Sequence, residues 1–294
     1  MPQAAVPAYV GQDFSPCPPG HRFNLYFCAW DERWALEREG ARAAALRDMR
    51  QPLPAPVAEL LAALGRRQLL LARALPRQQC LLIEARSTSP LATGLGTEHP
   101  AGNGFSFLSP YGLPYLAGSG VKGVFRRAAE ELLAEGEDGF EPYLPDVLFG
   151  TPQPGGEGRS AVLSEERGRR GALACWDVLP QVEAMALEVM TPHQGDYLLG
   201  TASPHDAGQP NPIRFLALPP GTAFCFVLVL DPGAVPGGCH AVLPKWQPLV
   251  RRIARHAFEW LGFGAKTAMG YGSMDSGETA PGTDSPCAGT DPVP

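Results

Sequence analysis

The chain has 294 residues, of which 45% are hydrophobic, so it is long enough for one large domain or two small ones with a sizeable core. Its formal net charge of −6 excludes a uniformly basic nucleic-acid-binding protein, and any contact with nucleic acid must come from a local patch. Its 34 glycines and 32 prolines predict many turns and loops, and its seven cysteines contain no CxxC pair of the kind that a zinc ribbon needs.

Two helices are predicted near the N-terminus, over residues 25–48 and 57–75, where Ala, Leu, Glu and Arg are frequent. The proline-rich stretch 51–56 separates them, and residues 1–22 are expected to be loose. The first residues include neither a basic segment nor an apolar one, so we expect no signal peptide, no membrane contact and a cytoplasmic protein.

The body of the protein is expected to begin with a strand at residues 80–85, followed by an irregular stretch over 87–118. Apolar residues at helical spacing then predict a helix over 119–135. Residues 136–170 are rich in glycine and proline and are expected to form an insertion with a short strand at 160–163.

Further strands are predicted at residues 172–179 and 184–190, and a hairpin should join 213–218 to 223–230 through Pro219-Pro220-Gly221. An amphipathic helix is predicted over 245–261, then a glycine-rich loop over 262–272 and a last short strand. The residues expected on the inner face of that helix are Trp246, Leu249, Ile253, Ala257 and Trp260.

The order strand, helix, strands, helix, strand favours an α+β fold with a ferredoxin-like (RRM-like) core and large loop insertions. We expect this core at residues 79–275, with residues 1–78 as an N-terminal helical extension that packs on it. The acidic, turn-rich residues 276–294 are expected to be a disordered tail.

The segment Gly118–Arg127 matches GxGxxG, but no strand precedes it directly, which disfavours a dinucleotide site. Its helix carries bases in the first half and acids in the second, the reverse of what the helix dipole favours. This order would be explained if the helix start binds an anion. The residues expected to bind it are Ser119, Gly120, Lys122 and Arg126. A glycine-rich start with a solvated charged face explains it equally well.

The loop Gly262–Gly272 contains one of only three lysines in the chain. Its Ala-Lys-Thr sequence lacks the glycine that a Walker A motif has before the lysine, so nucleotide binding of that kind is rejected. The glycine density favours a loop whose backbone approaches a ligand closely, with contacts from Gly264, Lys266, Thr267 and Gly270. The alternative is a tight turn into the last strand.

Two histidines stand in polar loop sequences, His193 in Met190–Tyr197 and His99 after Gly94–Glu98. One histidine with one carboxylate makes an incomplete catalytic or metal site, so we expect neither a catalytic residue nor a metal or other cofactor. His193 is expected to contact the ligand or to brace its loop.

These motifs together resemble the RAMP superfamily of CRISPR effector proteins, and within it the sixth subunits of type III-B Cmr complexes. The resemblance spans about residues 80–275. A small departure is Gly120, where the family pattern leads us to expect serine. The motifs that carry the resemblance are Gly94-Leu95-Gly96 with Pro100 and Asn103-Gly104-Phe105; Gly112-Leu113-Pro114-Tyr115 with Gly118–Gly123 and Arg126; Val189–His193 with Gly195-Asp196-Tyr197; Asn211-Pro212-Ile213 with Phe215-Leu216; and Gly262–Thr267 with Gly270-Tyr271-Gly272.

The resemblance implies an RRM-like subunit without nuclease activity that binds crRNA toward its 3′ end and caps the backbone filament. It implies contacts with other Cmr subunits (the filament RAMP subunit, the small helical subunit and the neighbouring terminal RAMP subunit) and an indirect contact with target RNA. Two other functions stay open: a metal-independent endoribonuclease with His193 or His99 as general base, and a protein–protein adaptor that never touches RNA.

Overall fold

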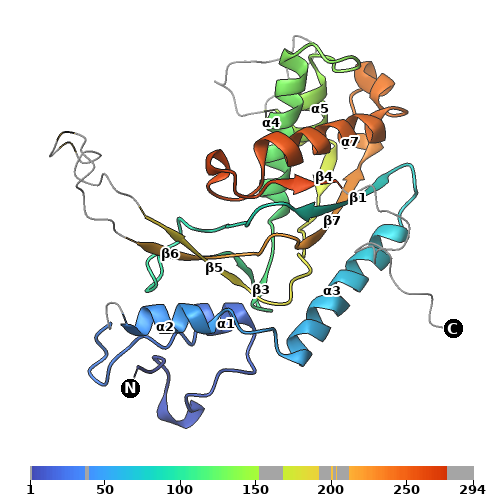
Figure 1. Ribbon diagram of the computed structural model, residues 1–294. Coiled ribbons are helices and arrows are strands. Elements are labelled where there is room, and N and C mark those ends of the chain that lie inside the picture. The colour runs from blue at the N-terminus through green and yellow to red at the C-terminus, as the bar shows by residue number, and fades with distance from the viewer. Residues whose placement is uncertain are drawn as a thin grey trace. The chain divides into compact units, whose positions relative to one another are not determined.

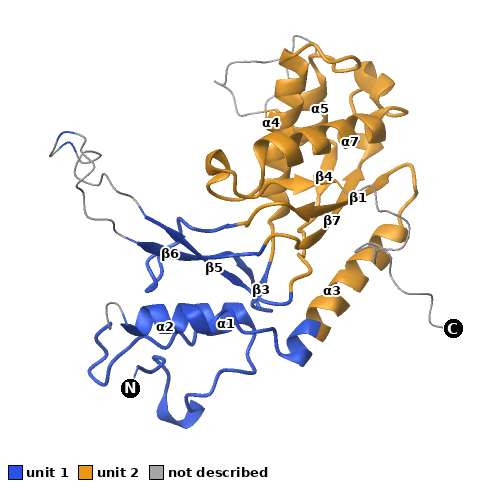
Figure 2. Ribbon diagram, in the orientation of Figure 1, with its two compact units in different colours: residues 1–58, 92–114, 183–219 blue, residues 59–91, 115–182, 220–294 orange. Residues whose placement is uncertain are grey.

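The computed structural model describes residues 2–36, 40–151, 168–191, 200, 203 and 212–276. The chain divides into two compact units that are interleaved along the sequence, as Figure 2 shows by colour. Unit 1 comprises residues 1–58, 92–114 and 183–219, and unit 2 comprises residues 59–91, 115–182 and 220–294.

Unit 2 contains a four-stranded antiparallel sheet in the order β4-β7-β1-β8. Its central pair, β1 and β7, is joined from Cys80↔Val229 to Arg86↔Ala223. In chain order the elements run β1, α4, β4, β7, α7, β8, which is compatible with the predicted ferredoxin-like arrangement. The strands are β1 (Cys80–Ser87), β4 (Leu173–Cys175), β7 (Ala223–Leu230) and β8 (Met274–Asp275).

Helices α4 (Gly118–Ala134) and α7 (Trp246–His256) cover one face of this sheet (Figure 1). Four buried phenylalanines from four segments meet beneath them, with ring centroids 5.1–6.3 Å apart. Burial of each ring contributes on the order of 2 kcal/mol, so this phenylalanine cluster is the main core of unit 2. It consists of Phe125, Phe226, Phe258 and Phe263.

Further helical elements complete unit 2, to which α3 (Ala55–Arg73) belongs from residue 59 onward. All six residues of α5 (Leu144–Phe149) are buried. The other elements are the 3₁₀ turns η3 (Pro232–Ala234), η4 (Gly237–Val242) and η6 (Thr267–Met269) and the π-helical turn η5 (Ala257–Leu261).

Unit 1 is built around α1, whose Gly20 donates its N–H to the Gly112 carbonyl at 2.7 Å. A Cβ on Gly20 would lie 2.6 Å from the ring of Phe107, so only glycine permits this approach. The elements of unit 1 are η1 (Ala8–Val10), α1 (Pro19–Asn24), α2 (Gly40–Asp48), the pair β2 (Phe107–Leu108) and β3 (Leu113–Pro114), and the pair β5 (Ala186–Met190) and β6 (Ile213–Ala217).

The prediction of a helix over residues 25–48 was wrong for its first part. Among the described residues of this stretch, 25–36 and 40–48, only those of α2 are helical, and Trp30 instead forms bridges with Gln3 and Leu36 in an extended conformation. The helix α1 lies in the stretch that was expected to be loose, and Pro19 occupies its first turn, where a missing N–H costs nothing.

The predicted hairpin between residues 213–218 and 223–230 does not form. β6 pairs with β5, and β7 is bordered by β1 on one edge and β4 on the other, so no edge of β7 is left for β6. Two adjacent prolines in the connection also lack the N–H groups that a tight hairpin turn uses. The local sequence pattern therefore predicted the two strands correctly, but the pairing predicted between them was wrong.

The strand predicted over residues 172–179 is shorter, because Val178 leaves the sheet and exchanges hydrogen bonds with Leu116 at 2.9 Å. The insertion predicted over 136–170 contains the helix α5, and its predicted strand at 160–163 lies outside the described residues. The predicted tail lies outside the described residues too, except for residue 276.

Other predictions are confirmed. They are the helices over 57–75 and 119–135, the strands over 80–85 and 184–190, and the last short strand.

Trp260 was expected on the inner face of α7, but 76% of it is exposed. The helix ends in the π-helical turn η5, where the Gly262 N–H donates to the Ala257 carbonyl at 2.8 Å, a spacing of five residues. The extra residue in this turn places Phe258 in the core and rotates Trp260 outward.

Candidate nucleic-acid interface

The start of α4 is held by a carboxylate from a distant part of the sequence. The Gly118 N–H donates to Asp177 Oδ1 at 2.7 Å, and a Cβ on Gly118 would lie 2.2 Å from the Cys175 carbonyl oxygen. The N–H groups of Gly120 and Val121 donate to the Ala117 carbonyl. The first-turn amides expected to bind an anion are thus largely taken up by the protein itself.

The outer edge of this helix start is open. Ser119 and Gly120 are exposed, and no atom lies within 4 Å of the Cβ position of Gly120 or Gly123. The structure shows no hydrogen-bond acceptor for the Ser119 N–H in the described part of the chain. A ligand can therefore approach the backbone closely along this edge.

Lys122 is half-buried one turn into α4. Burial lowers the pKa of its ammonium group, and the charges of Arg170 and Arg126 lower it further. The nearby Cys175 is not a counter-ion, because burial raises the pKa of its thiol to about 12 and keeps it neutral near pH 7. No ion pair of Lys122 is found among the described residues.

Arg126, which was predicted to contact the same anion, has partners within the chain. Its guanidinium contacts Glu130 and the buried carboxylate of Asp146 at 2.8 Å each and donates to the Gly150 carbonyl. Arg127 pairs with Glu131 at 2.8 Å. These pairs account for two of the three early bases of α4, so the reversed charge order needs an external explanation only at Lys122.

Arg170 is a member of this region that the sequence did not indicate. It is exposed, its backbone bridges to Gly150, and its charge is felt by Lys122. Lys122 and Arg170 are 48 positions apart, so no local motif joins them. With Ser119 and Gly120 they define what we call the α4 patch.

The loop over residues 262–272 is fastened at both ends by glycines. A Cβ on Gly272 would lie 1.9 Å from the Phe263 carbonyl oxygen, and one on Gly262 would lie 2.8 Å from that of Tyr271. The Phe263 N–H donates to the Gly272 carbonyl at 3.0 Å. Both glycines serve the closure of the loop rather than contact with a ligand.

The middle of the loop carries the predicted contact residues. Lys266 has the left-handed conformation, with φ +62, which is rare and costly for a residue other than glycine. Its carbonyl accepts the Met269 N–H at 2.9 Å, while Gly264 and Gly270 are exposed and Thr267 begins η6. Backbone strain of this kind persists only where the surrounding structure fixes it, and it is found often at functional sites.

The structure joins the two glycine-rich segments through the core of unit 2. Phe125, three residues after Lys122, meets Phe263, three residues before Lys266, with ring centroids 5.9 Å apart. Both lysines therefore project from segments anchored on the same phenylalanine cluster.

The two histidines differ in outcome. In unit 1, His99 stacks on Phe23 with centroids 3.7 Å apart, accepts the Ala101 N–H at Nδ1 and contacts the Phe23 carbonyl through Nε2. Burial lowers the pKa of His99, and both ring nitrogens make contacts within the chain, so the ring braces its loop in this structure. His193 lies outside the described residues.

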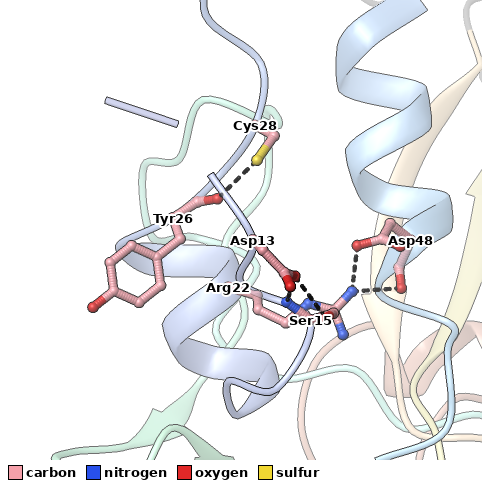
Figure 3. A network of polar contacts seen from close by, with 6 residues as sticks. All are labelled: Asp13, Ser15, Arg22, Tyr26, Cys28 and Asp48. Atoms are coloured by element: carbon pink, nitrogen blue, oxygen red, sulfur yellow. Dashed lines mark hydrogen bonds and ion pairs between the residues drawn. The ribbon is translucent and has the colours of Figure 1, made fainter. Parts of the chain in front are cut away.

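A pocket of about 170 Å³ in unit 1 contains none of the predicted site residues. Its polar groups satisfy one another (Figure 3): Arg22 donates to the carbonyl and carboxylate of Asp48, and Asp13 accepts from the hydroxyl of Ser15 at 2.7 Å. No cluster of metal-binding side chains occurs in the described residues. Among the same residues, no helix is long and apolar enough to cross a bilayer.

Comparison with known proteins agrees with this fold. The model of the RAMP superfamily matches residues 84–275. The CRISPR system Cmr subunit Cmr6 of Pyrococcus furiosus is 27% identical over 234 residues. The match covers 64% of this chain and 66% of that protein, so it spans just under two thirds of the relative's length.

Solved structures are similar as well. A chain in the cryo-EM structure of the type III-B Cmr-beta bound to cognate target RNA matches with a TM-score of 0.50 and 19% identity, over 80% of this chain and 70% of that chain. The crystal structure of Cmr6 from Pyrococcus furiosus matches with a TM-score of 0.35 and 22% identity, over 67% of this chain and 97% of that chain. At these identities the first match supports the fold.

Proposed function

The chain belongs to the RAMP superfamily, and from that premise we propose that it is a non-catalytic, RNA-binding subunit of a type III-B CRISPR (Cmr) effector complex in the cytoplasm. In this proposal it binds crRNA toward the 3′ end and caps the filament of related subunits. Residues 79–275 are the RNA-binding domain, and residues 1–78 and 276–294 are extensions of it. The likeness to Cmr6 of Pyrococcus furiosus supports the choice of complex.

The observation that carries the proposal is the uncompensated charge of Lys122. A half-buried ammonium beside Arg170, with no acid partner in the described residues, is unfavourable in the free protein. A phosphate at the open edge formed by Ser119 and Gly120 removes that penalty. Phosphate contacts carry no sequence information, which suits a protein that accepts any guide.

The second contact in the proposal is the loop over residues 262–272. Lys266, held in its left-handed conformation, contacts the RNA backbone, and the exposed Gly264 and Gly270 allow the strand to come close. The other predicted RNA contacts are Thr267 and His193, and His193 lies outside the described residues. Arg126 contributes mainly by holding α4 against Asp146.

The test is RNA retention by the purified complex that contains the double variant Lys122→Ala/Lys266→Ala. We expect less guide RNA per complex and a shallower dependence of RNA retention on salt concentration, because two phosphate contacts are removed. The matched control is Lys245→Ala, which removes the third lysine, exposed at the start of α7.

Unchanged RNA retention in the double variant would contradict the proposed contacts. If RNA does not crosslink to unit 2 at all, the chain is an adaptor between proteins. Cleavage of guide precursor by the purified chain, lost in His193→Ala, would instead establish the endoribonuclease.

A further inference from the structure

Trp260 is the most exposed tryptophan side chain among the described residues, at 76%. Tryptophan is mostly buried in folded proteins. If α7 continued as a regular α-helix, residue 260 would lie on its inner face. The π-helical turn η5 places it outside instead. Such turns occur frequently at functional sites.

The helix α7, which leads into this turn, carries two exposed arginines without ion pairs in the described part of the chain, Arg251 and Arg255. They are four residues apart, so their side chains are neighbours on the helix. Arg252 differs, because it contacts Glu137 and lies over the Phe140 ring at 4.9 Å.

One acid, Glu259, is exposed on this turn, and the structure shows no ion pair between it and the two arginines in the described residues. His256 is turned away and contacts Glu131 at 2.9 Å. In a chain with a net charge of −6, the two arginines make a local basic surface, and the exposed Trp260 follows Arg255 by five residues.

Trp260 is also continuous with the proposed RNA-binding loop. It stands two residues before Gly262, where the loop begins, and its neighbour Phe258 is fixed in the phenylalanine cluster. Met269, within the loop, is 63% exposed. The backbone that carries Trp260 is therefore anchored by Phe258, close in sequence to the start of the loop that carries Lys266.

We propose that Trp260 is a stacking platform for an unpaired base of single-stranded RNA, with Arg251 and Arg255 on the phosphates next to that base. Stacking on an aromatic ring beside a basic surface is how proteins bind single strands without reading sequence. The charge of the face favours RNA over an apolar protein partner. This inference rests on the proposed function and extends its RNA surface from the loop onto α7.

The test is equilibrium binding of the full-length chain to a fluorescently labelled, unstructured single-stranded RNA oligonucleotide. We expect Trp260→Ala to weaken binding about tenfold or more, and Trp260→Phe to restore most of the loss, since phenylalanine still stacks. The matched control is Trp34→Ala in unit 1, whose ring is also exposed, at 55%.

The salt dependence separates the two kinds of contact. Trp260→Ala should leave the slope of log affinity against log salt unchanged, while Arg251→Ala/Arg255→Ala should reduce it, because only the arginines displace counterions. Affinity of Trp260→Ala equal to that of the unaltered chain would overturn the stacking role. If that variant also fails to assemble with other complex subunits, the ring is a protein-docking residue.

Failure of this inference can be told apart from failure of the proposed function. If Lys122→Ala/Lys266→Ala weakens binding and Trp260→Ala does not, only the stacking role is wrong. If neither weakens binding, or the unaltered chain does not bind the oligonucleotide, both are overturned.

Discussion

The two glycine-rich segments of unit 2 use their glycines in opposite ways. At the start of α4, one glycine is packed against backbone, Gly118, while Gly120 and Gly123 face open space. In the loop, the outer glycines Gly262 and Gly272 are packed and the exposed ones lie between them. In both segments the packed glycines fix the geometry, and a lysine stands beside the open ones.

This comparison shows that glycine density alone does not locate a binding surface. The informative glycines are those whose Cβ position is empty, because no packing reason explains them. By that criterion the candidate surface includes only part of each glycine-rich motif, and Lys122 is the side chain with the most structural support for a contact.

The largest expected effect separates the two kinds of glycine within the loop. Gly272→Ala places a Cβ 1.9 Å from the Phe263 carbonyl oxygen at a positive φ, so we expect the free energy of unfolding to fall by about 3 kcal/mol or more. Gly270→Ala, also at positive φ but in open space, should cost about 1 kcal/mol. Urea unfolding measures both, and equal losses would contradict the distinction.

A second prediction separates the two basic residues of α4 that the sequence grouped together. Arg126→Ala leaves the buried carboxylate of Asp146 without its partner and should lower the free energy of unfolding by about 3 kcal/mol. Lys122→Ala should be neutral or slightly stabilising, since it removes an uncompensated charge. Thermal unfolding of the two variants tests this, and the exposed pair of Arg127 provides a control, Arg127→Ala, with a small effect.

The smallest effect concerns the contact between α4 and α7. The hydrogen bond from His256 lowers the pKa of Glu131, and the one from Arg127 lowers it further. A carboxyl group whose pKa is lower in the folded protein stabilises the fold fully above its unfolded-state pKa of 4.5. This stabilisation is lost as the pH falls through the folded-state pKa. The stability difference between the unaltered chain and Glu131→Gln should therefore shrink between pH 6 and pH 3. A constant difference would contradict the contact.

The sequence predicted most helices and strands because their apolar periodicity is local. It missed features that depend on distant residues: Asp177 caps α4 from 59 positions away, and Arg170 joins Lys122 from outside the motif. The pairing of β6 with β5 was hidden for the same reason, since both edges of β7 are filled by strands remote in sequence.

Local reasoning also failed where the backbone departs from regular geometry. Helical periodicity placed Trp260 inside, and a single π-helical turn reversed that. The charge order along α4 was read correctly as unusual, but its two arginines are explained by Glu130, Asp146 and Glu131. The base of α4 without an acid partner in the described residues is Lys122 alone, and no sequence pattern distinguishes it from Arg126 and Arg127.

The central claim is that Lys122 contacts an RNA phosphate. Its most direct test is the salt dependence of single-stranded RNA binding by the full-length Lys122→Ala variant, compared with Lys245→Ala. We expect Lys122→Ala to reduce the slope of log affinity against log salt by about 0.7, the value for one phosphate contact on a single strand, with Lys245→Ala unchanged. Equal slopes for the unaltered chain and both variants would contradict the claim.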